Sequence, residues 1–319
     1  MAQCTGGASG SSRRAYFLGI VLLLAAGVLW SLNGALIKLI NDSGRGPHAV
    51  VIAFYRSLFA GAFLLPSAWG KLHTLRSSRP GARLRIKPAG LSCVAFFALM
   101  TVFFVAANTQ TTAANAIVLQ YTSTFWVFGL SPWLLQERPR ANDLGVLAMA
   151  LTGIGVIFVG QAATDLFGLI NALGAGLFYG LLTLMIRRLR DCDSAAVTVM
   201  NTLGSAALIL PFAIGIGGCL LSRHVLLLLV IMGVVQFGVP YYLYTMGLVR
   251  VPAYQAALIT MIEPVLVPVW VYLAVGEAVP ATTKVGGAII LTALALLILS
   301  ARRRAPDGAV LAHGEPTSG

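Results

Sequence analysis

The chain has few charged residues for its length. Only 10% of its 319 residues are Asp, Glu, Lys or Arg, whereas a soluble domain carries about 25%. Hydrophobic residues make up 58%, and the mean hydropathy is +0.87. This composition excludes an ordinary soluble protein and indicates a chain whose solvent is lipid.

Residue types that commonly carry chemistry are also scarce and scattered. The four cysteines have no metal-like spacing: Cys4, Cys93, Cys192 and Cys219. The four histidines are expected in loops, at helix ends or in a tail: His48, His73, His224 and His313. The sequence has no HExxH, Walker A or Gly-x-Ser-x-Gly motif. We therefore predict no metal, no cofactor and no enzyme activity, and the chain alone is not an ATP-driven pump.

The net charge of +12 is compatible with nucleic acid, but the basic residues lie in short segments between long apolar runs. If the N-terminus is cytoplasmic, 17 of the 22 Lys and Arg fall on the cytoplasmic side and 4 fall outside. Membrane proteins orient themselves by this asymmetry. It predicts that both termini are cytoplasmic and that nucleic acid is not a partner.

Ten apolar stretches are long enough to cross the roughly 30 Å hydrocarbon core as helices. They cover residues 16–40, 49–70, 88–108, 112–134, 143–160, 165–187, 195–216, 224–248, 253–275 and 282–300. The stretches are continuous and rich in Leu and Ala, unlike the short alternating strands of a membrane barrel. The first is too long for a signal-peptide core, so we expect it to be retained. The sequence predicts an all-α polytopic protein with ten transmembrane helices.

The sequence also contains an internal repeat. Residues 115–137 match residues 255–277, since both begin at an amide side chain and end at a Glu that closes an apolar helix. Further back, Trp30 matches Tyr179. Each half then holds five helices, and an odd number forces the second half to enter the membrane from the opposite side. Inverted repeats of this kind are typical of secondary transporters, whose binding site lies at the midplane between the halves.

The repeat predicts how the chain is divided. We expect a disordered N-terminal tail over residues 1–14, a first repeat over 15–160, a second repeat over 165–300, and a basic disordered tail over 301–319. The composition hints at a bacterial source, so we place the protein in the cytoplasmic (inner) cell membrane as a multi-pass protein.

Several short motifs resemble the EamA repeat of the drug/metabolite transporter superfamily. They are Glu263–Pro264 inside a small-residue helix, and the closing Gly276–Glu277 and Glu137–Arg138. The first half departs from the pattern, with Ser123–Thr124 where the second half has Glu263–Pro264. The resemblance implies a ten-helix carrier of small polar metabolites such as amino acids, often an exporter and often proton-coupled. The alternative is a sensor or scaffold on the same fold that transports nothing.

Glu263 is the acidic residue expected in the middle of a span. A charge at this depth costs about 2.5–3.5 kcal/mol, which makes a functional role worth testing. Pro264 removes a backbone donor and should leave the carbonyl near Thr260 unpaired. The site could bind a proton, a cation or an amine. The competing interpretation is a structural Glu that pairs with an internal Arg.

Arg56 is expected about two turns into the second helix. It could bind a substrate carboxylate or phosphate, or neutralise Glu263. Alternatively, its side chain could snorkel to the headgroups. Lys38 and Arg187 lie nearer to helix ends, and we expect both to snorkel.

Polar and aromatic side chains inside the spans are weaker candidates for substrate binding. They are Trp30, Asn33, Tyr179, Tyr241, Tyr244 and Gln255. Each could equally serve helix packing. Small residues four apart predict close helix contacts, within the chain or in a homodimer: Gly27 and Ser31, Ser57 and Gly61, Gly176 and Gly180, Ala253 and Ala257.

Overall fold

The structure is a computed structural model in which the regular elements of the described residues are helical. It describes residues 6–41, 46–75, 88–111, 113–159, 166–217, 221–276 and 281–303. Helix α1 (Gly6–Trp30) begins inside the stretch expected to be an N-terminal tail, and α14 (Ala281–Arg303) continues into the expected C-terminal tail. Residues 1–5 and 304–319 lie outside the described residues, so the expectation of disorder there is not tested.

The first half contains five spans, three of them built from more than one helical segment. Its elements are α1 followed by α2 (Asn33–Asn41), α3 (Ala49–Ala68) with the 3-10 turn η1 (Trp69–Leu75), α4 (Pro88–Gln110), α5 (Ala113–Gln120) followed by α6 (Ser123–Leu134), and α7 (Ala141–Val159).

The second half repeats this order. Its elements are α8 (Leu166–Arg188), α9 (Ser194–Ile216), then α10 (Arg223–Ile231), the π-helical η2 (Met232–Gly238) and α11 (Val239–Arg250) as one span, then α12 (Ala253–Ile259), the 3-10 turn η3 (Thr260–Ile262) and α13 (Glu263–Val275) as another, and α14.

Nine helices among the described residues are long and apolar enough to cross a membrane. The fourth predicted span is not among these nine, and a turn at Tyr121 and Thr122 divides it into α5 and α6. Together α5 and α6 cover the predicted stretch. The all-helical architecture of ten spans in two five-helix repeats is therefore confirmed.

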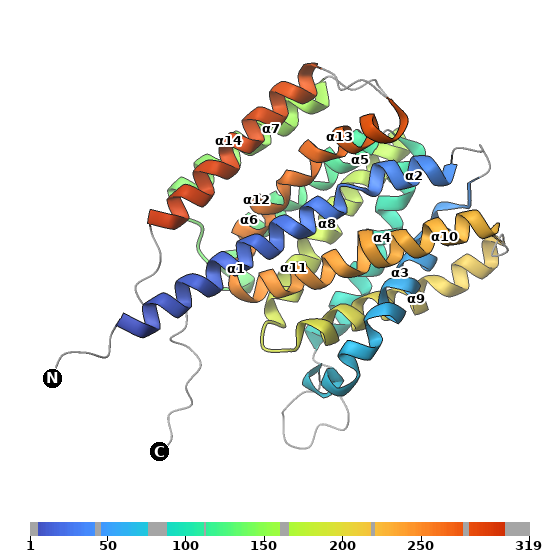
Figure 1. Ribbon diagram of the computed structural model, residues 1–319, viewed down its shortest axis with the longest axis horizontal. Coiled ribbons are helices and arrows are strands. Elements are labelled where there is room, and N and C mark those ends of the chain that lie inside the picture. The colour runs from blue at the N-terminus through green and yellow to red at the C-terminus, as the bar shows by residue number, and fades with distance from the viewer. Residues whose placement is uncertain are drawn as a thin grey trace.

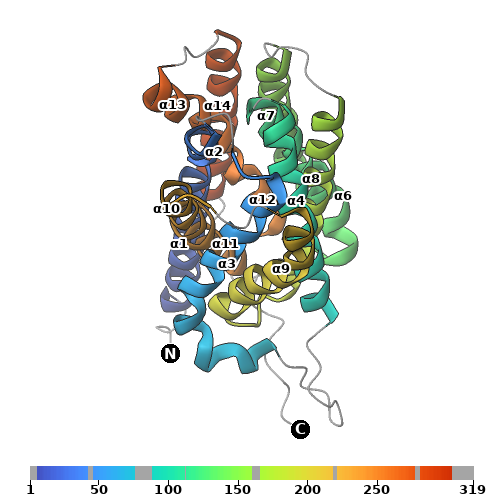
Figure 2. The same ribbon diagram turned by 90° about the vertical axis from the view of Figure 1, so that its right-hand side faces the viewer.

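Each of the main contacts between helices has a counterpart when the helices of one half are exchanged for the equivalent helices of the other. The contact of α4 with α8 is matched by that of α11 with α1, and the contact of α3 with η2 is matched by that of α9 with α4. Two further contacts join equivalent helices of the two halves, α3 with α9 and α7 with α14, so exchanging the halves leaves them unchanged. Both pairs lie side by side in Figures 1 and 2. This is the pattern expected of two like units related by a two-fold axis.

Two equivalent glycines let helices cross at the helix breaks. A Cβ atom on Gly27 of α1 would lie 2.5 Å from Cγ2 of Ile262 in η3. A Cβ atom on Gly176 of α8 would overlap Oγ1 of Thr122, between α5 and α6. The two glycines are 149 positions apart in the chain, the same separation as Trp30 and Tyr179. The first helix of each half thus crosses the broken helix of the other half at a site where no side chain fits.

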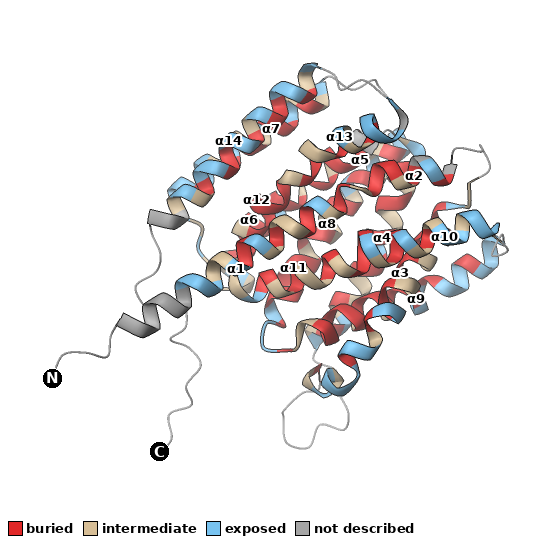
Figure 3. Cartoon of the chain, viewed as in Figure 1, coloured by how far each residue is buried: buried red, intermediate tan, exposed pale blue. Residues whose placement is uncertain are grey.

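Helix α1 begins and α14 ends at the same end of the bundle, on the left in Figure 1, as an even number of spans requires. Buried residues concentrate where α1, α4, α8, α11 and α12 meet, while α14 and the far end of α9 present many exposed positions (Figure 3). The small-residue positions Gly27, Gly61, Gly176 and Gly180 contact other helices of the same chain.

Candidate functional site

A small cavity lies at the centre, between the two halves. Its volume is about 20 Å3, which is room for about one water molecule. The first half contributes Trp30, Arg56, Met100, Phe104 and Gln120, and the second half contributes Tyr179, Gln236, Tyr241 and Glu263. The structure therefore brings five of the eight candidate residues to one place: Trp30, Arg56, Tyr179, Tyr241 and Glu263.

Arg56 is held at this cavity by α3 and is only 2% exposed. Its guanidinium lies over the ring of Phe237, 3.9 Å from the centroid, a cation–π contact. One terminal nitrogen donates to Oδ1 of Asn33 at 3.4 Å, and the buried Nε has no protein partner. The alternative that Arg56 snorkels to the headgroups is therefore not what the structure shows.

Glu263 approaches the cavity from the first turn of α13 and is 7% exposed. The hydroxyl oxygen of Tyr121 lies 2.9 Å from its Oε2, within hydrogen-bond distance. Glu263 and Arg56 are both described, and no ion pair within 4 Å joins them. The cavity is therefore lined by one acidic and one basic side chain, from opposite halves, that do not neutralise each other by direct contact.

Aromatic rings form one wall of the cavity. The ring of Trp30 packs against three tyrosines, with centroid distances of 4.8 Å to Tyr241, 5.1 Å to Tyr244 and 6.1 Å to Tyr179. The indole Nε1 of Trp30 is buried and has no partner among the described residues. An aromatic wall with an unused donor can stack on a ligand and hydrogen-bond it.

The π-helical segment η2 places Gln236 beside the cavity. Its amide nitrogen donates to the backbone oxygen of Trp30 at 3.2 Å, where α1 ends, while its Oε1 is buried without a protein partner. A Cβ atom on Gly233 would lie 2.9 Å from the backbone oxygen of Arg56, so this segment packs directly on α3. Wide helical turns of this type occur frequently at functional sites.

Three candidate residues do not line the cavity. Asn33 lies behind Arg56 and accepts its hydrogen bond. Tyr244 shares a hydrogen bond of 2.8 Å with the hydroxyl of Thr183. Gln255 lies near the start of α12 and accepts from Tyr16 of α1 at 2.7 Å. The first two support the site from outside it, and Gln255 joins two helices elsewhere.

Arg187 does not snorkel as the sequence suggested. It is 4% exposed, and its Nε donates to Oε1 of Glu137 at 2.6 Å. Its terminal nitrogen donates to the backbone oxygens of Leu248 and Val249, the latter at 3.0 Å. Glu137 also accepts from the backbone N–H of Ala253 at 2.8 Å. This group, the Arg187–Glu137 clamp, joins the ends of α6 and α8 to the turn before α12, because that turn leaves carbonyls without helical partners.

The repeat makes Lys38 the counterpart of Arg187 and Glu277 the counterpart of Glu137. The side chain of Lys38 and the whole of Glu277 lie outside the described residues, so the expectation that Lys38 snorkels is not tested.

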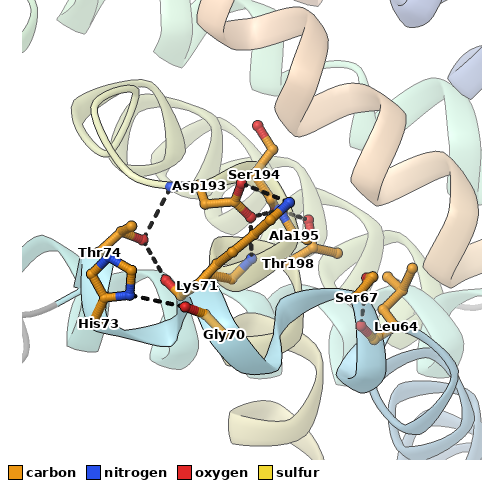
Figure 4. A network of polar contacts seen from close by, with 11 residues as sticks. Leu64, Ser67, Gly70, Lys71, His73, Thr74, Asp193, Ser194, Ala195 and Thr198 are labelled. Carbon is orange, nitrogen blue, oxygen red and sulfur yellow. Dashed lines mark hydrogen bonds and ion pairs between the residues drawn. The ribbon is translucent and has the colours of Figure 1, made fainter.

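A second contact between the halves lies where η1 meets the start of α9 (Figure 4). Lys71 makes an ion pair of 3.3 Å with Asp193, and Thr74 accepts from the backbone N–H of Asp193 at 3.1 Å. Asp193 also accepts from the backbone N–H groups of Ala195 and Ala196, as an N-cap does. Lys71 is half exposed, so this contact belongs to the surface of the bundle.

Four cavity residues and Tyr121 carry little signal in the sequence. Met100 and Phe104 carry no polar signal, and Gln120 and Gln236 are single amides inside apolar runs, which occur equally in helix packing. Tyr121 lies 140 positions before Met261, so the repeat alone could have placed it at the break opposite η3. The hydroxyl of Tyr121 is the group that joins the two breaks.

Comparison with known proteins agrees with this arrangement of two halves. The profile of the EamA-like transporter family matches residues 17–159 and again residues 166–299. The chain belongs to the EamA-like transporter family. The two matches correspond to the two five-helix units seen in the structure, so this is a multi-pass membrane protein of a transporter family.

Similar proteins with known sequences carry transporter names. An uncharacterized transporter of Archaeoglobus fulgidus is 31% identical over 201 residues, which cover 62% of this chain and 72% of the relative. The uncharacterized transporter YwfM of Bacillus subtilis is 26% identical over 303 residues, 92% of this chain and 97% of the relative. Solved structures match as well, and for one crystal structure among them the TM-score is 0.72 and the identity 19%, over 91% of this chain and 99% of that chain. At that identity the match shows the fold alone.

Proposed function

We propose that this EamA-like protein is a secondary transporter that exports small polar metabolites such as amino acids by alternating access, with proton coupling at Glu263. Its place would be the cytoplasmic membrane, with both termini in the cytoplasm, as the 17-to-4 distribution of basic residues suggests. Family membership supports transport, and the cavity supports the class of substrate.

The observation that carries the proposal is the pairing of Arg56 and Glu263 at one central cavity without a salt bridge between them. Burying a charge without a partner is costly. A ligand that carries both an ammonium and a carboxylate offers a partner to each side chain. The unpartnered Nε1 of Trp30 and Oε1 of Gln236 offer further hydrogen bonds to such a ligand.

The size of the cavity supports alternating access. Pockets that enclose a small molecule measure about 300–1,000 Å3, whereas this one holds about 20 Å3. A metabolite therefore enters only when the two halves separate. Because Arg56 belongs to the first half and Glu263 to the second, rocking one half against the other changes their separation, which couples ligand binding to the motion.

The test is transport by the purified protein in liposomes without ATP. We expect counterflow of at least one radiolabelled amino acid, with a rate that depends on pH. Glu263→Gln should abolish the pH dependence, because an amide cannot exchange a proton. Asp191→Asn, which removes an exposed carboxylate in the loop after α8, is the matched control and should behave like the wild type. A Glu263→Gln protein with unchanged flux and pH profile would contradict proton coupling.

A further inference from the structure

The hydroxyl of Tyr121 contacts two acceptors from the other half of the chain. Its oxygen lies 2.5 Å from the backbone oxygen of Thr260 and 2.9 Å from Oε2 of Glu263. Tyr121 is 2% exposed, so no bulk water replaces either contact. A phenol carries one hydrogen. The two acceptors therefore compete for it.

The protonation state of Glu263 decides the competition. If the tyrosine hydrogen points to the Thr260 oxygen, which is the shorter contact, Glu263 must supply its own hydrogen to the phenol oxygen. If Glu263 is ionised, it requires the tyrosine hydrogen, and the oxygens of Tyr121 and Thr260 then face each other at 2.5 Å with no hydrogen between them. The observed geometry fits a protonated Glu263, and loss of that proton must disturb the contact with Thr260.

The carbonyl of Thr260 depends on this contact because of Pro264. Pro264 has no backbone N–H, so it cannot donate to the carbonyl four residues earlier. The backbone N–H of Glu263 makes the short 3-10 bond to Thr260, and Tyr121 supplies the second donor. Tyr121 thus stabilises the break at η3 from the opposite half.

The break at η3 is mechanically connected to the first span. Ile262 packs where Gly27 of α1 has no side chain. Beyond the break, Nε1 of Trp270 in α13 donates to Oγ of Ser31, between α1 and α2, at 2.7 Å. A change at Thr260 therefore changes how α13 sits against α1 and α2.

Few titratable groups surround Glu263 among the described residues. They are Arg56 from α3, Tyr121 beside α5, Tyr179 from α8, and Tyr241 from α11. Arg56 makes no direct ion pair with Glu263, and among the described residues the carboxyl of Glu263 is hydrogen-bonded to Tyr121. Tyr121 is therefore the side chain placed to respond when the proton leaves.

We propose that Tyr121 is a positioning residue that links the proton on Glu263 to the bend between α12 and α13. While Glu263 is protonated, the Tyr121 hydroxyl donates to the backbone oxygen of Thr260 and stabilises the bend at η3. When Glu263 ionises, the hydroxyl turns to the carboxylate and releases the Thr260 carbonyl, which frees α13 to move against α2. The inference rests on the proposed proton coupling at Glu263 and adds the group that transmits it.

The first test needs no substrate and uses infrared difference spectroscopy of the protein in lipid during a pH titration. The band of the protonated carboxyl that disappears in Glu263→Gln reports Glu263. Tyr121→Phe should move its midpoint upward by about 0.5–1 pH unit, because a hydrogen bond to a carboxylate is stronger than one to the neutral acid. The C=O frequency should also change, which loss of packing alone does not predict.

Tyr16→Phe is the matched control. It also removes a tyrosine hydroxyl that joins the first half to α12, through Gln255, but far from Glu263. In Tyr16→Phe the titration midpoint of the Glu263 carboxyl band should equal that of the wild type. If Tyr121→Phe leaves the midpoint and the C=O frequency of the Glu263 band unchanged, Tyr121 does not act on Glu263. This conclusion holds whether or not the protein transports amino acids in liposomes. If the wild type shows flux but no titrating Glu263 band, proton linkage through Tyr121 is also excluded.

A second measurement avoids variants of Tyr121. Backbone hydrogen exchange of residues 260–263 should become about fivefold faster above the midpoint in the wild type, after correction for intrinsic pH effects, because one hydrogen bond at the break is lost. In Glu263→Gln the amide donates permanently to the Tyr121 oxygen, so exchange should stay slow at both pH values. Equal acceleration in both proteins would overturn the proposal. Absence of amino-acid flux with this exchange pattern intact would instead refute amino-acid transport and leave the link through Tyr121 in place.

Discussion

Two buried arginines of this transporter have opposite surroundings. Arg187 meets Glu137 and two backbone carbonyls, so charge and hydrogen bonds are satisfied. Arg56 meets the ring of Phe237 and one amide oxygen, and its Nε is unpartnered. Each arginine has a glutamate in its region, Glu137 partly buried and Glu263 buried, yet only Arg187 is in ion-pair contact with one. An arginine and a glutamate therefore form an ion pair at one end of the bundle, whereas at its centre an arginine and a glutamate line the same cavity without forming one.

The difference separates stability from function. A buried ion pair is costly to break because removing one partner leaves the other as an isolated charge. A buried arginine without an ion-pair partner already carries that cost, and such groups inside a membrane are commonly retained for function. The Arg187–Glu137 clamp joins the two halves, whereas the proposed function assigns Arg56 and Glu263 to the substrate. Variants at the two sites should separate these roles.

The largest effect is expected at the clamp. Glu137→Ala leaves Arg187 buried without its carboxylate and should cost about 3–5 kcal/mol of stability. Thermal unfolding of the detergent-solubilised protein, followed by size-exclusion chromatography, measures this. Removing both charges in Glu137→Leu/Arg187→Met should recover part of the loss. Recovery is incomplete because Glu137 also accepts from the N–H of Ala253. If Glu137→Ala were as stable as the wild type, the Arg187–Glu137 clamp would contribute nothing to the stability of the protein.

A smaller energetic effect with a larger functional effect is expected at Arg56. Arg56→Gln should reduce amino-acid counterflow by about tenfold or more, as loss of a hydrogen bond to a charged ligand group does. Stability should stay within about 1 kcal/mol of the wild type, because the variant also removes an unpaired buried charge. Arg56→Lys keeps the charge but loses the planar stacking on Phe237, so its flux should be intermediate. If Arg56→Gln transported amino acids at the wild-type rate, Arg56 would not bind the substrate.

The central residues could be predicted largely because charge is so scarce in this chain. Glu263 and Arg56 are conspicuous inside apolar runs, and the repeat makes Trp30 and Tyr179 equivalent positions. Both pairs of signals are local in the sequence or follow from its periodicity. The structure places all four at one cavity.

The clamp and the position of Gln255 could not be predicted, because both depend on how helices pack. Arg187 near a helix end looks like a snorkelling residue until the turn before α12 is seen to cover it. Gln255 resembles a polar site residue, but it lies eight residues before Glu263, about 12 Å along a helix at 1.5 Å per residue. Nor does spacing alone show that Tyr121 reaches across to Thr260.

The smallest effect is expected at Lys71, and it completes the comparison. Lys71 and Asp193 also join the two halves, but Lys71 is 52% exposed, so solvent screens the pair (Figure 4). Lys71→Met should therefore change stability by less than about 1 kcal/mol and leave flux unchanged. Asp193→Ala should cost more, because Asp193 also caps the first N–H groups of α9. If Lys71→Met destabilised the protein as much as Glu137→Ala, contact between the halves would explain both effects and burial would explain neither. If the two differ as expected, it is the exclusion of water around Arg187, rather than the crossing from one half to the other, that makes its ion pair structural.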